Sequence, residues 1–165
     1  MKLNKNIRKA KVSDIPEIQR LLVEVNMVHH NIRPDLFKGP ATKYTVDELK
    51  EIIADENRPI FVCVGDNGEF YGYIFCELIE TKESQLRTGI RTLYIDDLCV
   101  DESARGQHAG SALYKYALNY ASELHCYNVT LHVWEGNDTA ERFYRNIGMK
   151  PQYTCMETIL APDKI

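Results

Sequence analysis

The sequence has no long hydrophobic run, and this absence excludes a protein with a membrane-spanning helix. No stretch approaches the roughly 20 consecutive apolar residues that a membrane-spanning helix needs. The basic N-terminus is not followed by the apolar segment of a secretory signal peptide. We therefore expect a cytoplasmic protein without a membrane partner.

Paired cysteines are also absent. The five cysteines are scattered, and no two of them form a Cys-x-x-Cys pair. This distribution predicts buried free thiols, rather than the disulfide framework of a small secreted domain or the ligand set of a zinc site. We expect no metal cofactor.

An excess of basic residues is the third absence. The chain has 20 Lys and Arg residues against 24 Asp and Glu residues, which gives a net charge of −4. Nucleic-acid binding needs basic patches that neutralise phosphates, so we expect no nucleic-acid partner. The mild acidic excess suits a cationic small molecule or a basic peptide instead.

What the sequence does contain is a series of regular hydrophobic patterns within one domain, residues 1–165. Apolar residues recur at helical spacing in some segments and at strand spacing in others. We expect helices over about 13–30, 45–55, 110–124 and 138–147, and strands over about 6–11, 60–64, 70–79, 93–100, 129–134, 149–153 and 154–160. The order of these elements predicts an α/β fold (α+β) with one mixed sheet flanked by helices.

The stretch from Leu93 to Leu113 connects one of these strands to one of these helices through a glycine-flanked loop. The first backbone N–H groups of a helix have no intrahelical acceptor, and the helix dipole adds positive charge there. The stretch therefore predicts a phosphate-binding loop, with an ordinary strand-to-helix connection as the alternative. The loop consists of Arg105, Gly106, Gln107, His108, Ala109 and Gly110.

Two stretches resemble the signatures of the GNAT acetyltransferases, a family that moves an acetyl group from acetyl-CoA to an amine. The first is the loop from Arg105 to Gly110, after a strand that contains Val100. The second is the segment LHVWEGN with the helix that follows it, from Asn137 to Tyr144. The resemblance covers essentially the whole chain and implies a GNAT-like acyl-CoA N-acyltransferase fold with a central mixed sheet.

The resemblance also implies which residues hold acetyl-CoA. Backbone groups of the strand and loop would bind this co-substrate. Asn137 would contact its pantetheine arm, although an asparagine at this place also suits a helix N-cap. The implied binding residues are Leu98, Val100, Arg105, Gly106, Gln107, His108, Ala109, Gly110, Ser111 and Asn137.

His108 departs from the family pattern, because the signature has glycine at this position. A side chain is tolerated in a phosphate-binding loop where the backbone φ is negative, but not where φ must be positive. Since His108 stands at the predicted helix start, we expect a helical φ and a working loop.

Asp96 and Tyr144 are the candidate catalytic residues. An amine with a pKa near 10.4 must lose its proton before it attacks, which costs on the order of 4–5 kcal/mol at pH 7. Family members carry a base at the positions of Tyr94 and Asp96, and we expect Asp96 to act as the base through water. A substrate anchor and a solvated carboxylate are the alternatives. Tyr144 matches the family tyrosine that protonates the CoA thiolate, with a buried core tyrosine as the alternative.

Strand alternation is expected to divide residues 94–100 between two faces. The face that borders the acetyl group in the family would hold Tyr94, Asp96, Leu98 and Val100. The opposite face would hold Ile95, Asp97 and Cys99. On this reading Asp97 makes a structural hydrogen bond, and a covalent acetyl-cysteine on Cys99 is disfavoured.

Together these residues predict an N-acetyltransferase that transfers an acetyl group from acetyl-CoA to a primary amine of a small molecule or peptide. The amine would attack directly in a ternary complex. A non-catalytic acyl-CoA-binding or sensor module is the alternative. The resemblance also implies a homodimer as one assembly. The acceptor stays open, because loops 29–44 and 82–90 would select it and their conformation does not follow from the sequence.

Overall fold

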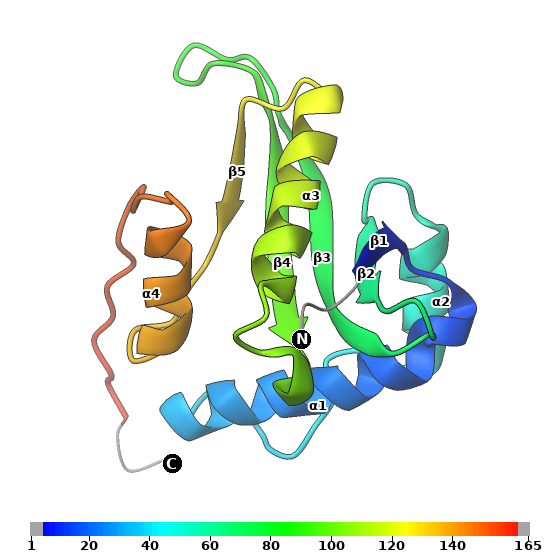
Figure 1. Cartoon of the computed structure of the whole chain (residues 1–165). Helices are drawn as coiled ribbons and strands as arrows, with labels where there is room; N and C mark the ends of the chain where they lie inside the picture. Colours follow the sequence, from blue (N-terminus) through cyan, green and yellow to red (C-terminus); the bar gives the residue numbers. More distant parts are fainter. Residues whose placement is uncertain (1–4, 162–165) are drawn as a thin grey trace.

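A five-stranded mixed sheet forms the centre of the molecule, in a computed structural model that describes residues 5–161. The strands lie in sequence order across the sheet, and Figure 1 shows them from β5 on one side to β1 on the other. Each neighbouring pair is antiparallel except β4 and β5, which are parallel. The strands are β1 (Asn6–Lys9), β2 (Ile60–Val64), β3 (Phe70–Thr81), β4 (Ile90–Val100) and β5 (Asn128–Leu131).

Helices cover both faces of the sheet, and each face has its own hydrophobic core. The first core lies under α1 and α2, while the second lies under α3, which crosses β4 and β3 in Figure 1. The last helix, α4, stands beyond β5 and has no buried residue. The helices are α1 (Ile15–Ile32), α2 (Val46–Ala54), α3 (Ala109–Glu123) and α4 (Asp138–Asn146), with short 3₁₀ turns η1 (Val12–Asp14) and η2 (Glu102–Ala104).

The structure confirms the predicted helices to within a few residues, and the predicted strands 60–64 and 70–79 pair with each other as β2 and β3. Thr45 and Glu48 form a reciprocal capping box at the start of α2, with the Thr45 N–H donating to the Glu48 carboxylate at 2.7 Å. Gly72 of β3 lies so close to β4 that a Cβ there would meet the Cys99 carbonyl oxygen at 2.4 Å. This glycine therefore marks a close backbone approach.

A one-residue bulge at Asp96 changes which side chains share a face of β4. Phe75 of β3 pairs with Asp97, but the next residue, Cys76, pairs with Ile95, so Asp96 has no partner on β3. An extra residue shifts every later side chain to the other face. The strict alternation predicted for residues 94–100 is therefore wrong.

The bulge places Asp96 and Asp97 on the α1 side of the sheet, and Ile95 and Leu98 on the α3 side. Ile95 and Leu98 both belong to the core under α3, whereas Cys99 belongs to the core under α1. Asp96 and Asp97 are hydrogen-bonded to tyrosines that pack in the α1 core. The two adjacent carboxylates thus lie on the same side of the sheet, which an unbroken strand would not allow.

The predicted strands 149–153 and 154–160 are also wrong, because residues 149–161 form no strand. All of these residues after Met149 are exposed, so no buried face sets a strand register. The segment is held instead by single contacts, among them an ion pair between Arg33 and Glu157. β5 is likewise shorter than predicted and ends at Leu131.

No helix in the described part of the chain is long and apolar enough to cross a membrane. The five cysteines are free thiols, of which Cys63, Cys76 and Cys99 are buried.

Candidate active site

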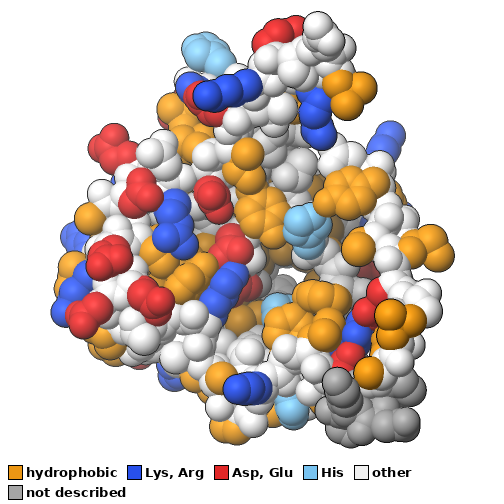
Figure 2. Space-filling view, turned by 180° about the vertical axis from the view of Figure 1, so that it is seen from behind, with side chains coloured by type: hydrophobic (Ala, Val, Ile, Leu, Met, Phe, Trp, Pro, Cys, Tyr) orange, Lys and Arg blue, Asp and Glu red, His pale blue; other side chains and the backbone are white. Residues whose placement is uncertain are grey.

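The candidate site lies where β5 diverges from β4. The parallel pairing runs from Thr92–Asn128 to Ile95–Leu131 and stops there. Beyond this point, the edge of β4 from Asp96 to Val100 has no strand partner on that side among residues 5–161. Figure 2 shows a hollow near the middle of the back face, bordered by charged and hydrophobic side chains. Unpaired backbone groups of a strand next to a hollow can bind an extended ligand.

We call the space beside residues 96–100 of β4 the opening. Of its two carboxylates, Asp96 accepts more side-chain hydrogen bonds than Asp97. Its Oδ2 accepts hydrogen bonds from Lys43 Nζ at 2.7 Å and from Tyr44 Oη at 3.0 Å. Both donors come from the loop between α1 and α2. The Tyr44 ring stacks on the Phe75 ring, and this contact holds the Tyr44 hydroxyl over β4. Burial and the neighbouring Asp96 charge raise the pKa of Tyr44.

Asp97 has a different environment, although it is the next residue. Its Oδ2 accepts one hydrogen bond, from the buried Tyr73 hydroxyl at 2.8 Å. Loss of water contact raises the pKa of Asp97 to about 6, and the Asp96 charge adds to the rise, against the lowering effects of the Tyr73 hydroxyl and the Lys43 charge. Asp97 thus makes the structural hydrogen bond expected of it, and it also changes charge near neutral pH.

Tyr144 reaches the opening from α4. Burial raises the pKa of its phenol well above the ordinary value, and the charge of Asp97 adds to this rise. The phenol therefore stays protonated at neutral pH. Its hydroxyl has no hydrogen-bond partner within residues 5–161, so it is free to donate to a ligand in the opening.

The loop from Arg105 to Gly110 leads into the first turn of α3 beside the opening. His108 is the N-cap residue, and its side chain makes no capping hydrogen bond. The first N–H groups of the helix are therefore left for another acceptor. A Cβ at Gly110 would lie 3.3 Å from Phe143 and 3.4 Å from Val100, so glycine lets α3 and α4 approach here.

The backbone of His108 contradicts the expected helical φ, because φ is +64° and the residue is left-handed. The reason is the preceding turn: Gly106 also has a positive φ, of +73°, and the chain must reverse before α3 begins. Histidine is one of the residues that enter this region at moderate cost. The imidazole is exposed, so it does not fill the loop.

The remaining predicted binding residues lie on β4, in the loop before α3 and in the first turn of α3. Leu98 and Val100 are half-buried on the α3 face of β4. The Arg105 Nε donates to the Val100 carbonyl at 3.3 Å, and the Gln107 amide donates to the Ser103 carbonyl at 3.0 Å, so both side chains tie the loop to β4 and η2. Ala109, Gly110 and Ser111 form the first turn of α3.

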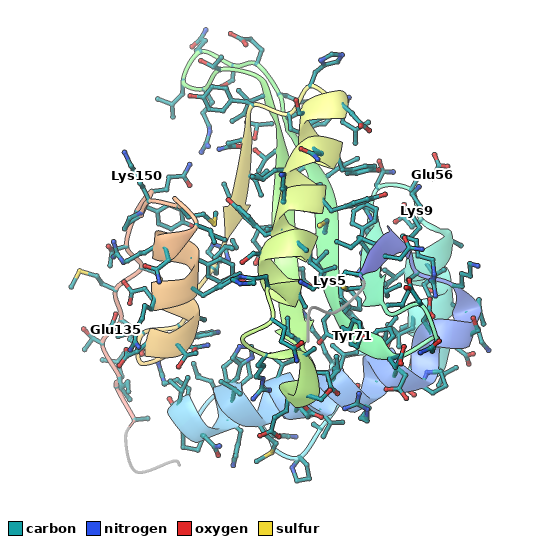
Figure 3. The ribbon with its side chains drawn as sticks, viewed as in Figure 1. Lys5, Lys9, Glu56, Tyr71, Glu135 and Lys150 are labelled. Carbon is teal, nitrogen blue, oxygen red and sulfur yellow. The ribbon has the colours of Figure 1, made fainter. Side chains whose placement is uncertain are left out.

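Asn137 caps α4, as the alternative interpretation expected. Its Oδ1 accepts from the Ala140 N–H at 3.3 Å. Glu135 lies just before this helix and Lys150 just after it, as Figure 3 shows. The capping bond of Asn137 uses Oδ1, which leaves the side-chain NH₂ group of Asn137 available to a ligand.

The sequence indicated loop 29–44 as a part of the site but not which of its residues reach β4. Lys43 and Tyr44 come from this loop, whose shape no local pattern predicts. An aromatic cluster joins the same loop to α1 and to the segment after β5: the Phe37 ring centroid lies 5.2 Å from that of His29 and 5.3 Å from that of Trp134. Trp134 is 38% exposed and therefore does not lie in the core.

A hydrogen-bonded chain of rings extends along the same side. The Tyr94 hydroxyl lies 3.0 Å from His132 Nδ1, and the Tyr153 hydroxyl lies 3.0 Å from His132 Nε2. The chain connects β4, the end of β5 and the C-terminal segment. The alternating pattern of the predicted strand 129–134 was the only sequence feature that indicated where His132 lies.

Cys99 lies on the same side of the sheet as Asp96 but is not exposed to the opening. Its Sγ faces the Leu21 carbonyl at 3.8 Å, and burial raises the pKa of the thiol to about 12. The expected separation of Cys99 and Asp96 onto opposite faces is therefore wrong, while a protonated, buried thiol remains a poor nucleophile. Residues 5–161 contain no group of three or more metal-ligating side chains.

The sequence profile of the acetyltransferase (GNAT) family matches residues 26–149. This protein therefore belongs to the GNAT acetyltransferase family.

Solved structures of other proteins have a similar fold. The BH1408 protein from Bacillus halodurans, studied as a tetramutant, is 29% identical, with a TM-score of 0.90 over 94% of this chain and 99% of that one. Glucosamine-6-phosphate N-acetyltransferase from Arabidopsis thaliana is 21% identical, with a TM-score of 0.67 over 95% and 99% of the two chains. An aminoglycoside acetyltransferase from an uncultured soil metagenomic sample, in complex with sisomicin, is 18% identical, with a TM-score of 0.66 over 94% and 96%. The last two show the likeness of the fold alone.

Proposed function

We propose that this protein transfers an acetyl group from acetyl-CoA to a primary amine of a small molecule or peptide, by direct attack in a ternary complex. One observation carries the proposal. Where β4 loses its partner β5, Asp96 and Asp97 lie side by side, the charge of Asp97 acts on the Tyr144 phenol, and the first turn of α3 has no side-chain cap. The names of the two enzymes above, which act on glucosamine-6-phosphate and aminoglycosides, support an amine as the acceptor.

The residues around the opening fit acetyl-CoA. The free N–H groups of Ala109, Gly110 and Ser111 would hold the phosphates, with the backbone of Gly106, Gln107 and His108 around them. The edge of β4 at Leu98 and Val100 would pair with the extended arm. The Asn137 NH₂ group and the cationic Arg105 would complete the binding surface. When bound, acetyl-CoA supplies the thioester that donates the acetyl group.

The side chains of the opening divide the proton transfers between them. The acceptor ammonium must first lose a proton, and we assign this proton to the Asp96 carboxylate, through water. The phenol of Tyr144, which stays protonated at neutral pH, donates its proton to the departing thiolate. Asp97 lies next to both residues and contributes its charge to their surroundings.

The first test is calorimetric titration with acetyl-CoA, with ATP and NAD as controls. Micromolar binding of acetyl-CoA alone supports the proposal, and no binding contradicts it. Turnover is then measured as free-thiol release with a panel of primary amines. We expect Asp96→Asn to reduce the rate by roughly tenfold or more, as loss of a general base does. An unchanged rate would overturn the role of Asp96.

A non-catalytic acyl-CoA sensor remains the second candidate, and one contact favours it. Lys43 and Tyr44 both occupy the oxygen of Asp96 that would serve as the base. A sensor would bind acetyl-CoA with the same affinity and release no thiol with any amine.

A cytoplasmic location and a homodimer are part of the proposal, and size-exclusion chromatography with light scattering tests the dimer.

A further inference from the structure

The ammonium of Lys43 lies inside the candidate site, in contact with the proposed base. Its Nζ is 2.7 Å from Asp96 Oδ2, and the charge is also 5.4 Å from the centre of the Tyr44 ring. The Lys43 side chain is 44% exposed, so it is held at the surface of the opening rather than buried in the core. A primary alkylammonium of the protein itself therefore occupies the place where an acceptor amine must give up its proton.

The charge of Lys43 also acts on residues of other elements. Its charge lowers the pKa of His29 on α1, after the larger effect of burial. It also opposes the pKa rises of Asp97 and Tyr94 on β4. These residues come from separate elements that border the same opening, so the ammonium lies among them rather than at the margin.

We propose that Lys43 is itself an acetyl acceptor, so that the protein acetylates its own Lys43 Nζ when acetyl-CoA is bound. This inference rests on the proposed function. It assigns the donor thioester an acceptor that the chain carries in its own loop, 2.7 Å from the carboxylate that takes the proton.

The reaction balances without any further reagent. The Lys43 ammonium passes one proton to Asp96, and the freed nitrogen lone pair forms a bond to the thioester carbonyl carbon. The carbon–sulfur bond breaks with its electron pair on sulfur, and Tyr144 protonates the thiolate. The nitrogen returns its second proton to Tyr144, and Asp96 releases the first to water. The products are the acetyl-lysine amide, the CoA thiol and one proton.

The modification would change the site. An acetylated lysine has no charge and cannot form an ion pair, so Asp96 would lose its cationic partner and become free to serve an external amine. The chain also offers a matched control for ordinary chemical acetylation. Lys50 on α2 pairs with Asp47 at 3.0 Å and is 51% exposed, close to the 44% of Lys43, but it lies outside the site.

The experiment incubates the full-length protein with acetyl-CoA and no added amine, and peptide mass spectrometry follows the acetylation of Lys43 and Lys50. We expect Lys43 to be acetylated roughly tenfold faster or more, in line with general acid–base catalysis. Asp96→Asn and Tyr144→Phe should each reduce the Lys43 rate and leave the Lys50 rate unchanged. A Lys43→Arg variant should leave Lys50 unchanged as well. Equal rates at the two lysines would overturn the proposal.

Further measurements separate the possible failures. The rate per molecule should not change on dilution, since the acceptor and the site share one chain, whereas a rate that falls with protein concentration overturns self-acetylation. A protein that releases thiol with an added amine but never modifies Lys43 overturns this inference and keeps the proposed function. Failure to bind acetyl-CoA overturns both.

A ligand-free readout tests the contact on which the proposal rests. The neighbouring carboxylate raises the pKa of the Lys43 ammonium against the lowering effect of burial. An NMR titration of ¹³C-methylated lysines should therefore show a lower Lys43 pKa in Asp96→Asn than in the unchanged protein. An equal pKa in both would mean that the ion pair does not form in solution, which overturns the proposal.

Discussion

The two sides of the sheet differ in how completely they are paired. Every residue of β2 is buried, and β2 pairs along its whole length with β3. On the other side, β4 and β5 share only the pairs from Thr92–Asn128 to Ile95–Leu131, and no residue of β5 is fully buried. The closed side provides stability, while the incomplete side leaves backbone edges and polar side chains free for a ligand.

The largest expected effect tests the stability half of this contrast. Leu22→Ala removes a side chain with 0% exposure from the core under α1, and should lower the free energy of unfolding by about 2–5 kcal/mol. Leu131→Ala on the half-buried β5 should cost less, about 1–2 kcal/mol. Urea denaturation measures both. Equal losses would contradict the view that the incomplete side contributes less to stability.

The next effect concerns Asp97, whose pKa of about 6 lies above the ordinary value of 3.8. The folded state then binds this proton more tightly than the unfolded state, so stability falls as pH rises from about 4 to 6 and levels off above. Asp97→Asn should remove about 1–3 kcal/mol of this fall while keeping an acceptor for the Tyr73 hydroxyl. Unfolding curves at several pH values measure it. Parallel profiles for the two proteins would show that Asp97 does not titrate in this range.

Tyr144→Phe tests the functional half of the contrast, in which the incompletely paired side of the sheet serves the ligand. Since the phenol makes no hydrogen bond within the described residues, its loss should leave the free energy of unfolding within about 0.5 kcal/mol of the original. The turnover number should fall roughly tenfold, which is about 1.4 kcal/mol of activation free energy. Tyr127→Phe, at a tyrosine that is 76% exposed, is the control and should change neither. Unchanged turnover in Tyr144→Phe would remove Tyr144 from the mechanism.

The smallest effect distinguishes two histidines at the ends of α3. His108 and His125 both have positive φ, of 64° and 56°. Replacing either with glycine relieves the left-handed strain but adds unfolded-state entropy, so stability should rise by about 1 kcal/mol or less. Thermal unfolding measures this. Only His108→Gly should alter acetyl-CoA affinity, and an equal change in His125→Gly would argue against a phosphate-binding role for the loop.

Much of the fold follows from local signals. The capping residues of α2, the β2–β3 turn and the glycine-flanked loop before α3 are encoded within a few neighbouring positions, and the structure confirms them. The C-terminal strands were wrong because alternation alone does not create a strand. A strand also needs a neighbour with free backbone groups and a face to bury, and residues 150–161 have no buried face.

The sequence proposed candidate site residues but not their contacts. The stretch from Leu93 to Leu113 and its family resemblance indicated Asp96 and the loop as candidates. The bulge that turns Asp96 and Asp97 to one side depends on how β4 pairs with β3, which involves residues about 20 positions away in sequence. The left-handed His108 likewise reflects the closure of the turn rather than a helix start.

The sequence by itself determined the family, the order of most helices and strands and the position of the glycine-flanked loop before α3, because these depend on short-range patterns of hydrophobicity, capping and glycine. Only the tertiary structure decided that Lys43 meets Asp96, 53 positions away, and that Tyr144 comes near Asp97. Such contacts arise where separate elements pack, and no local pattern records which loop side chain will meet which strand.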